Sequence, residues 1–562
     1  GNNARIVFTA PLSTVADGAI GAWAIANSTD YAAYNTGNGV GIVGQGGYVG
    51  YSPSFGSGQI TNLATGANLV STLPSGGATT GMLRFSNAFT NNLEFTNPGD
   101  TLHLELGGIL RSNEAGATTI GTPATRGIIT SGTGELVLFN QQNTLTVNSI
   151  IQGATQLNKG GAGTLTLTAG NTYTGGTIFN QGTINLNPTV TDGSVTVIPA
   201  GGLTINGGTT GSGTLVNVAS SNAIAASNNL IINGRGSITY ATAATNNALN
   251  SVTFNNTGGE ASPTITLPTN GVLTLGSTSG ITATSSNAAT TATITGGTVV
   301  IPAGTNTFAV DAIKIGSQAY TGNQATLNIA SAIAGGSSSI NKTGDGLLQL
   351  GGQSTFTGGI NVTAGGIILG GSSTNTSSGP LGVGATTFAG GTSLWVDNND
   401  RSVFNDMTFV GNPVFNNIST TLRTLTLNGD MTFSNLGSSG TVIDIPTPFL
   451  NVILGGNIAG IGSVTAIGGT GPNTISKSGL GNITGINLAG INPTATINIS
   501  ALTSGAFSFL TDVDGNVNPA TQSFGAVTVT GIPKLIIWRT GVDFNPLYPL
   551  AVNKTITPAS LS

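Results

Sequence analysis

Two segments of the chain, 157–186 and 340–369, align without a gap over 30 residues. Both carry an Asn-Lys pair, a Gly-x-Gly, a Leu-x-Leu and a Thr-Gly-Gly in the same order. Apolar residues recur at every second position and glycines stand between these runs, which predicts three short strands joined by three turns in each copy. A unit this short cannot bury its own apolar face, so it must stack on neighbouring units as the coils of a β-solenoid do.

These motifs resemble the autotransporter-associated β-strand repeat of bacterial passenger domains and related large surface proteins. The match is strongest at 158–186 and 341–369 and continues in fragments at 132–138 and 475–483. Near the N-terminus, 20–34 looks like a segment that often precedes such repeats. The resemblance implies an exported, all-β protein built as a right-handed parallel β-helix or closely related β-solenoid, located extracellularly or on the bacterial cell surface.

The composition supports the same fold class independently. Only 6% of the residues are charged, where about 25% is usual, while 38% are hydrophobic and 88 are glycine. Disordered chains combine high charge with low hydrophobicity, which is the opposite of this composition. Short strands of apolar residues and threonine, with Gly and Asn at positive-φ corners, account for it better. Coils adding about 4.8 Å each would make a rod on the order of 100 Å long, with open sheet edges at its ends.

Charge and cysteine content limit the partners. The net charge is −5 and no basic run occurs, so nucleic acid and anionic membranes are not expected partners. The absence of cysteine is compatible with an exported protein. No apolar run approaches the roughly 18 residues of a membrane-spanning helix.

Three regions are expected from the pattern. Residues 1–125 are richer in aromatic and charged residues and are interpreted as an N-terminal cap or the opening coils. Residues 126–500 continue the strand-and-glycine rhythm, with Ser/Thr-rich side loops at 277–293 and 372–378. Residues 501–562 form a C-terminal cap or a tail that links subunits, since 533–550 combines a dense apolar strand with prolines that a central strand would not tolerate.

Residues able to carry chemistry are few. His103, the single histidine, lies in an alternating strand pattern that places it on the polar face, opposite Leu102 and Leu104. Asp512, Asp514 and Asn516 offer alternating oxygen ligands of the kind calcium prefers, but the glycine and glutamate positions differ from a calcium loop and a turn is the favoured interpretation.

The remaining candidates are weaker still. Asp397, Asp400, Arg401 and Asp406 form the densest acidic group, expected to be a solvated loop rather than a glycosidase-type site. The lysines at position 159 and at its repeat equivalent 342 could in principle form isopeptide bonds with asparagine, although plain structural lysines are favoured.

The sequence therefore predicts a non-enzymatic protein without a cofactor. The first hypothesis is a structural one, a subunit of a bacterial surface fibre or surface layer that self-associates through its ends or its C-terminal tail. The alternative is a monomeric rod-like adhesin that presents its Thr/Ser/Asn face or N-terminal aromatic residues to a glycan or a protein. A polysaccharide-processing enzyme is the third and least favoured hypothesis.

Overall fold

The structure, a computed structural model, describes most of the chain. It covers residues 18–456 except 36, 65, 67, 190–194, 209–212, 321 and 435–440, and beyond them 458–459, 466–467, 474–487, 497–500, 507–511, 527–530, 535–539 and 557–559. Every regular element of more than one residue in these ranges is a β-strand. The chain divides into two compact units, residues 1–276 with 295–297, and residues 277–294 with 298–562.

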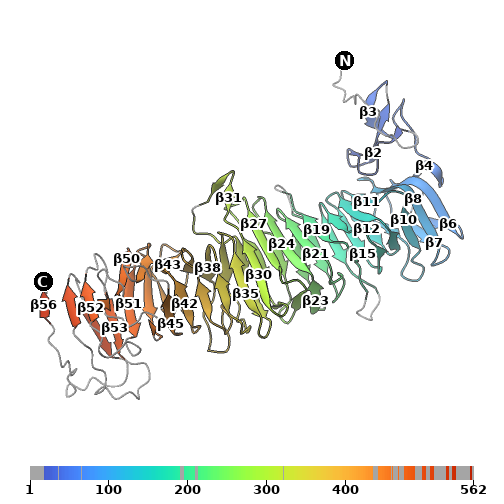
Figure 1. Cartoon of the computed structure of the whole chain (residues 1–562). Coiled ribbons are helices and arrows are strands. Elements are labelled where there is room, and N and C mark those ends of the chain that lie inside the picture. Colours follow the sequence, from blue (N-terminus) through green and yellow to red (C-terminus); the bar gives the residue numbers. More distant parts are fainter. Residues whose placement is uncertain are drawn as a thin grey trace. The chain divides into compact units, whose positions relative to one another are not determined.

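Unit 1 is a coil of three parallel walls, named A, B and C (Figure 1). Most turns of the chain contribute a strand to each wall in that order, but between β16 and β23 the described residues add strands to walls B and C only. Wall A comprises β10 (Ile128–Ser131), β13 (Ile150–Gly153) and β16 (Thr172–Tyr173), and further on β23 (Asn246–Leu249) and β26 (Val272–Leu275). Wall B comprises β11 (Glu135–Asn140), β14 (Gln156–Gly160), β17 (Thr177–Phe179), β19 (Leu203–Asn206), β21 (Asn229–Asn233) and β24 (Ser251–Asn256). Wall C comprises β5 (Leu69–Leu73), β7 (Asn91–Phe95), β9 (Thr118–Ile120), β12 (Thr144–Val147), β15 (Thr164–Leu167), β18 (Thr183–Leu186), β20 (Leu215–Val218), β22 (Ser237–Tyr240) and β25 (Thr264–Thr266).

Three long strands open the coil of unit 1. They are β4 (Gly56–Leu63), β6 (Gly77–Phe85) and β8 (Thr101–Arg111), and neighbouring members pair in parallel. The first part of β8 pairs with β10 of wall A and its last part with β11 of wall B, so one bent strand feeds two walls. The bend falls at Gly107, where φ is +66° and a Cβ atom would lie 2.0 Å from the carbonyl oxygen of Glu135. Only glycine fits a backbone this close to the next coil.

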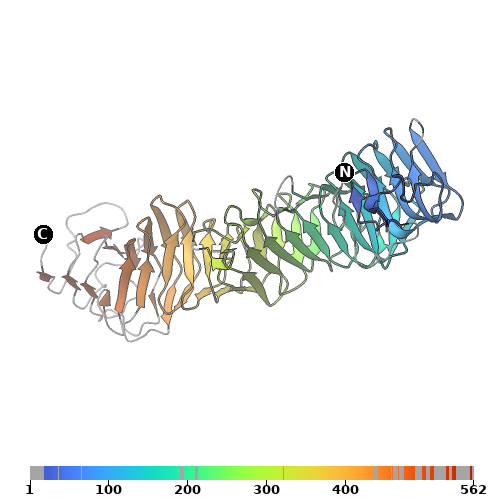
Figure 2. The same cartoon turned by 90° about the horizontal axis from the view of Figure 1, so that it is seen from above.

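Unit 2 repeats the same arrangement, and Figure 2 shows its strands stacked as parallel rungs. Its wall B comprises β27 (Ile281–Ser285), β30 (Thr305–Val310), β35 (Ser339–Thr343), β37 (Ile360–Val362), β39 (Thr386–Phe388), β42 (Met407–Val410), β45 (Met431–Ser434) and β48 (Ile458–Ala459). Its wall C comprises β28 (Ala292–Thr295), β33 (Leu327–Ile329), β36 (Leu347–Leu350), β38 (Gly366–Leu369), β40 (Ser393–Val396), β43 (Val414–Asn417), β46 (Thr441–Ile445), β49 (Ala466–Ile467) and β50 (Thr474–Gly479). Its wall A comprises β29 (Thr298–Val300) and β34 (Ala332–Ala334), then β41 (Arg401–Val403), β44 (Arg423–Leu427), β47 (Leu450–Leu454), β51 (Asn482–Asn487), β53 (Phe507–Thr511) and β55 (Leu535–Arg539).

The hydrophobic core lies inside the coils, and its side chains stack in register from one coil to the next. In wall C of unit 1 the fully buried residues Leu145, Leu165, Ile184, Val216 and Ile238 are successive register partners. Each is flanked by partly exposed residues, because neighbouring side chains of a strand point to opposite faces. The parallel β-solenoid predicted from the repeats is therefore present.

The coils are shorter than the repeat that encodes them. Leu165 pairs with Leu145 and with Ile184, so these coils take 20 and 19 residues, and the 30-residue segment 157–186 holds five strands, β14 to β18. The prediction of three strands per copy is wrong, because strands of two to five residues suffice where every strand pairs with neighbours above and below. The side loop predicted at 277–293 is also wrong, since β27 and the start of β28 lie within it.

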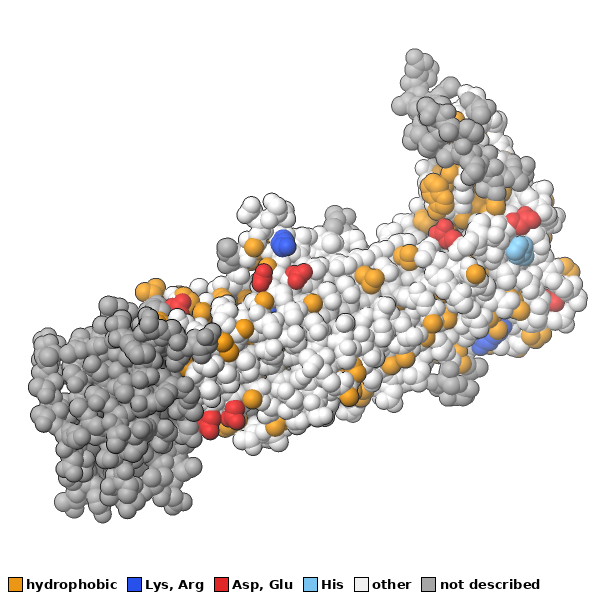
Figure 3. Space-filling model, in the orientation of Figure 1, with side chains coloured by type: hydrophobic (Ala, Val, Ile, Leu, Met, Phe, Trp, Pro, Cys, Tyr) orange, Lys and Arg blue, Asp and Glu red, His pale blue; other side chains and the backbone are white. Residues whose placement is uncertain are grey.

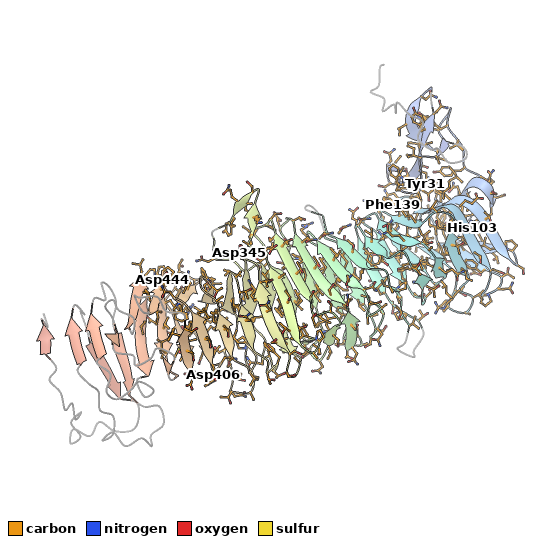
Figure 4. The ribbon with its side chains drawn as sticks, viewed as in Figure 1. Tyr31, His103, Phe139, Asp345, Asp406 and Asp444 are labelled. Carbon is orange, nitrogen blue, oxygen red and sulfur yellow. The ribbon has the colours of Figure 1, made fainter. Side chains whose placement is uncertain are left out.

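The N-terminal segment adds a small antiparallel sheet to unit 1. Strands β1 (Ile25–Ala26), β2 (Asp30–Asn35) and β3 (Gly39–Ile42) form it. Its buried Tyr31 donates a hydrogen bond to the carbonyl oxygen of Leu83, 3.0 Å away, and shares a hydrophobic cluster with Leu110 and Val137. Figure 4 shows Tyr31 close to Phe139, which packs against this cluster from β11. The sheet thus covers outward-facing apolar residues of wall B, and the parallel coil itself is already established at β4.

The last described strands continue parallel pairing within the chain. β55 pairs with β53, and β52 (Ile497–Ser500), β54 (Val527–Thr530) and β56 (Thr557–Ala559) form a three-stranded parallel sheet. The strand 535–539, which we considered as a linker to another subunit, is thus engaged by its own chain on at least one edge. Residues 533–534 and 540–550 of the predicted linking segment lie outside the described residues.

The two Thr-Gly-Gly turns correct one sequence-based prediction. The sequence suggested that Gly175 and Gly358 hold backbone conformations that are difficult for a residue with a Cβ atom, but positive φ occurs one residue later, at Gly176 (+85°) and Gly359 (+79°). The first glycine of each pair is required for a different reason, since a Cβ on Gly175 would lie 2.5 Å from the amide nitrogen of Gln156. A Cβ on Gly358 would lie 2.5 Å from the carbonyl oxygens at 337 and 338.

Replacing Leu165 or Leu167 by Asp is expected to destabilise unit 1 by about 4 kcal/mol or more, because an unpaired charge would enter the stacked core. Both side chains are fully buried. Thermal melts followed by circular dichroism measure the effect, with Thr166→Asp on the outward face of the same strand as the control. Equal melting temperatures for Leu165→Asp and the unmodified protein would exclude this packing.

Alanine at Gly358 or Gly359 is expected to lower the free energy of unfolding by about 1–3 kcal/mol, through backbone overlap at the first and through left-handed φ at the second. Gly134→Ala is the control, since its Cβ meets no atom within 4 Å and its φ is not positive. Denaturant melts compare the three variants. A control that proves as damaging as the turn variants would contradict the explanation.

Candidate interaction surfaces

The described residues contain no group of three or more His, Asp or Glu side chains able to hold a metal ion. His103 lies on the outward face of β8, as its alternating pattern predicted, and its Nδ1 is 2.9 Å from Thr130 Oγ1. The weak calcium candidates Asp512, Asp514 and Asn516 lie outside the described residues.

The acidic group near 400 is occupied by turn contacts. Asp397 forms an ion pair with Arg401 and accepts a hydrogen bond from the amide of Asn399 at 3.0 Å. Asp400 and Asp406 accept hydrogen bonds from the main-chain amides of residues 424 and 430, one coil further along. Figure 4 places Asp406 on the opposite edge of unit 2 from Asp345 and Asp444. These carboxylates fasten turns to the next coil and do not converge on one point.

The two lysines of the repeats are completely buried. The Lys159 Nζ atom donates to the carbonyl oxygens of Gly160 (2.7 Å), Gly161 (2.6 Å) and Gln181 (3.2 Å). Lys342 makes the equivalent bonds, to the carbonyl oxygens of residues 343 (3.1 Å), 344 (2.6 Å) and 364 (2.9 Å). Each ammonium therefore joins the turn of its own coil to a turn 22 residues later.

This arrangement was not predicted, although the signal was present. Both copies carry a lysine at the same position, next to a Gly-x-Gly turn, as expected if the lysine side chain stabilises that turn. The hydrogen bonds of both Nζ atoms go to main-chain oxygens rather than to asparagine side chains, so their geometry gives the isopeptide hypothesis no support.

Burial opposes the charge of these lysines. Loss of hydration lowers the pKa of Lys159 to about 7, from an ordinary value of 10.5. The pKa of Lys342 falls to about 8 for the same reason, with Asp345 and Asp311 acting in the opposite direction. Three carbonyl acceptors favour the ammonium form, so the two effects compete at each lysine.

The outer faces of the walls are polar and almost uncharged, as Figure 3 shows over the described part of one face. In unit 1 the central outward positions of wall C form one register column whose members are mostly threonine and asparagine. From β9 to β25 these are Thr119, Thr146, Thr166, Asn185, Asn217, Thr239 and Thr266.

An asparagine ladder runs along wall B of the same unit. Asn206, Asn233 and Asn255 each donate from Nδ2 to the Oδ1 atom of the asparagine one coil earlier, at 2.7 to 2.8 Å, and Asn180 is the first acceptor. These amides are bonded to one another, so the ladder joins the coils.

Wall C of unit 2 carries a different column. Its central outward positions are Asn328, Gln349, Ile368, Trp395 and Asn416, which are successive register partners. A separate antiparallel hairpin, β31 (Lys314–Ile315) with β32 (Gln318–Ala319), stands out from the coils of this unit (Figure 1) and exposes Ile315 and Tyr320.

Comparisons with known proteins give one family and one relative. A family model described as the passenger-associated-transport-repeat matches residues 157–186 and 340–369. The chain is also 57% identical over 42 residues to the adhesin BmaC autotransporter of Brucella suis biovar 1 (strain 1330). That match covers 8% of this chain and 1% of the adhesin. No solved structure matches the chain.

The chain therefore carries two passenger-type repeats of the kind found in autotransporters. The described residues include no helix long and apolar enough to cross a membrane.

The buried lysines give the protein an expected pH dependence. Their pKa values are lower in the folded than in the unfolded chain, so between about pH 7 and 10.5 the unfolded chain binds more protons. The free energy of unfolding should rise with pH across this interval, by on the order of 1 kcal/mol or more per lysine. Denaturant melts from pH 6 to 10 measure it. The rise should disappear in the Lys159→Met/Lys342→Met variant and persist in Lys314→Met, whose side chain is exposed; identical profiles would refute this explanation.

Proposed function

We propose that this chain is part of an exported bacterial surface protein and acts as a non-enzymatic adhesin. The observation that carries the proposal is the pair of passenger-type repeats, together with local identity to a protein named as an autotransporter adhesin. The identity is confined to a small part of that adhesin, so its printed name guides the proposal and supplies no ligand.

The described surface supports an adhesive rather than a catalytic role. The parallel coils present long columns of neutral hydroxyl and amide groups, while the carboxylates near 400 are used in turns. Hydrolysis of a glycosidic bond needs two carboxylates facing one site. A rigid wall of neutral hydrogen-bonding groups instead suits recognition of a surface without chemical change.

Self-association into a fibre or surface layer, our first hypothesis from the sequence, has less support. One of its two routes was strand addition by the C-terminal segment, and β55 of that segment pairs with β53 of the same chain. Neither comparison mentions a filament. The monomeric adhesin therefore becomes the preferred function.

The test is binding of the purified chain to fixed epithelial cells, with its mass in solution measured by analytical ultracentrifugation. A cysteine introduced at Ser317 on the hairpin accepts one fluorophore, because the chain has no cysteine of its own. We expect saturable binding by a monomer and at least tenfold weaker binding by a variant that carries both Leu165→Asp and Ile367→Asp, which place a charge in the buried core of each unit. Non-saturable binding equal to that of the variant, or conversion of the chain into polymers before it binds, would contradict the proposal.

A further inference from the structure

One outward column of unit 2 differs from the other polar columns because it contains an aromatic residue. Trp395 on β40 stands between Ile368 on β38 and Asn416 on β43. The corresponding outward positions of wall C in unit 1, from β9 to β25, hold threonine and asparagine and no aromatic residue.

The indole is anchored to its own strand by a hydrogen bond. Its Nε1 donates to Ser393 Oγ at 2.7 Å, which fixes the ring orientation. Ile368 points outward, since Ile367 and Leu369 on either side pair within the inward columns, and yet it is fully buried. A neighbouring outward side chain must cover it, and its register partner Trp395 is the largest available. Trp395 itself remains partly exposed to solvent.

Amide groups lie along the same line on both sides of the ring. Gln349 and Asn328 lie one and two coils before Ile368, and Asn416 lies one coil after Trp395. The Gln349 side chain extends over Gly370, where a Cβ atom would lie 2.8 Å from its Nε2. The amide nitrogens of Gln349, Asn328 and Asn416 have no hydrogen-bond partner among the described residues, in contrast with the mutually bonded ladder of wall B in unit 1.

We propose that this column, Asn328, Gln349, Trp395 and Asn416, binds an uncharged, extended polysaccharide that runs along the coil axis. The face of an aromatic ring is electron-rich and attracts the C–H groups on the apolar face of a sugar ring. Side-chain amides both donate to and accept from sugar hydroxyl groups. Successive coils are about 4.8 Å apart, so a linear glycan with one sugar per coil can meet the same type of contact repeatedly.

The charges around the column favour a neutral ligand. Arg401, the cation nearest in sequence to Trp395, is already paired with Asp397. Lys314, the cation of the described residues that is most open to solvent, lies on the separate hairpin. No lysine or arginine stands among the outward residues of the column itself, which favours an uncharged ligand over an acidic one. A protein partner would need a wider apolar patch than one indole.

The proposal rests on the adhesin function and names its ligand class. The probes are hexasaccharides of cellulose, chitin, xylan and mannan, with an alginate hexasaccharide as the acidic control. In a Trp23→Phe/Trp538→Phe background, Trp395 is the sole tryptophan, so its emission reports contact directly. We expect at least one neutral hexasaccharide to shift this emission saturably. It should bind at least tenfold more weakly, by calorimetry, to Trp395→Ala in the otherwise unmodified chain.

Two further variants keep the test independent of folding. Gln349→Ala and Asn328→Ala remove amides that bond to no described residue, so they should weaken binding several-fold while leaving the melting temperature unchanged. Trp23→Ala, at a tryptophan that is 66% exposed in unit 1, and Tyr320→Ala on the hairpin are the controls and should bind as the unmodified chain does.

The outcomes separate this proposal from the function on which it rests. If the chain binds cells but no neutral hexasaccharide shifts Trp395, or if Trp395→Ala and Gln349→Ala bind sugar unchanged, the column is not the glycan site and the adhesin function stands. Stronger binding of alginate than of every neutral sugar also overturns the proposal. If Trp395→Ala loses cell binding and protease treatment of the cells abolishes binding of the unmodified chain to the same extent, the ligand is a protein and the proposal fails. If the chain binds neither cells nor sugars, both proposals fail.

Discussion

Register between successive coils is the constraint on which the rest of this structure depends. A strand of two to five residues has too few hydrogen bonds to persist alone. It is stable here because the strands before and after it pair with it, residue for residue, along each wall. That pairing places Leu145, Leu165 and Ile184 above one another inside the coil and, by the same alternation, Thr146, Thr166 and Asn185 above one another outside. The same register thus sets both the core and the outer surface.

Several cationic side chains join neighbouring coils through main-chain oxygens, which offsets the cost of removing their charge from water. Lys159 and Lys342 bring a charge into the interior and each donates to three carbonyl oxygens. Arg126 joins three corners, through the carbonyl oxygens of Asn148 and Thr168 and the hydroxyl of Thr189. The outward amides of Gln349 and Asn328, by contrast, form no side-chain hydrogen bond to the described residues and remain available to a ligand or to water.

The repeats made the fold predictable, because both the stacking direction and the inward positions follow from period-two alternation and the short unit. Leu165, Leu167 and His103 face where the pattern placed them. The Thr-Gly-Gly turns were predicted to be turns, but the sequence could not say which glycine has positive φ and which admits the neighbouring backbone. The contacts of Lys159 and Trp395 escaped prediction for a common reason. Each side chain meets a residue one coil away. The number of residues between such partners equals the length of a coil, which the sequence did not reveal.

The most direct test of in-register stacking is the distance between outward residues of neighbouring coils, which the absence of cysteine makes accessible. Nitroxide labels on cysteines at Thr166 and Asn185, register partners one coil apart, should lie about 5 Å apart at the backbone and show spin-exchange broadening. Labels at Thr166 and Thr239 are three coils apart, about 14 Å along the axis, and should show dipolar coupling without exchange. Exchange that is absent from the first pair, or equal in both, would contradict in-register stacking and, with it, the columns of outward side chains along each wall.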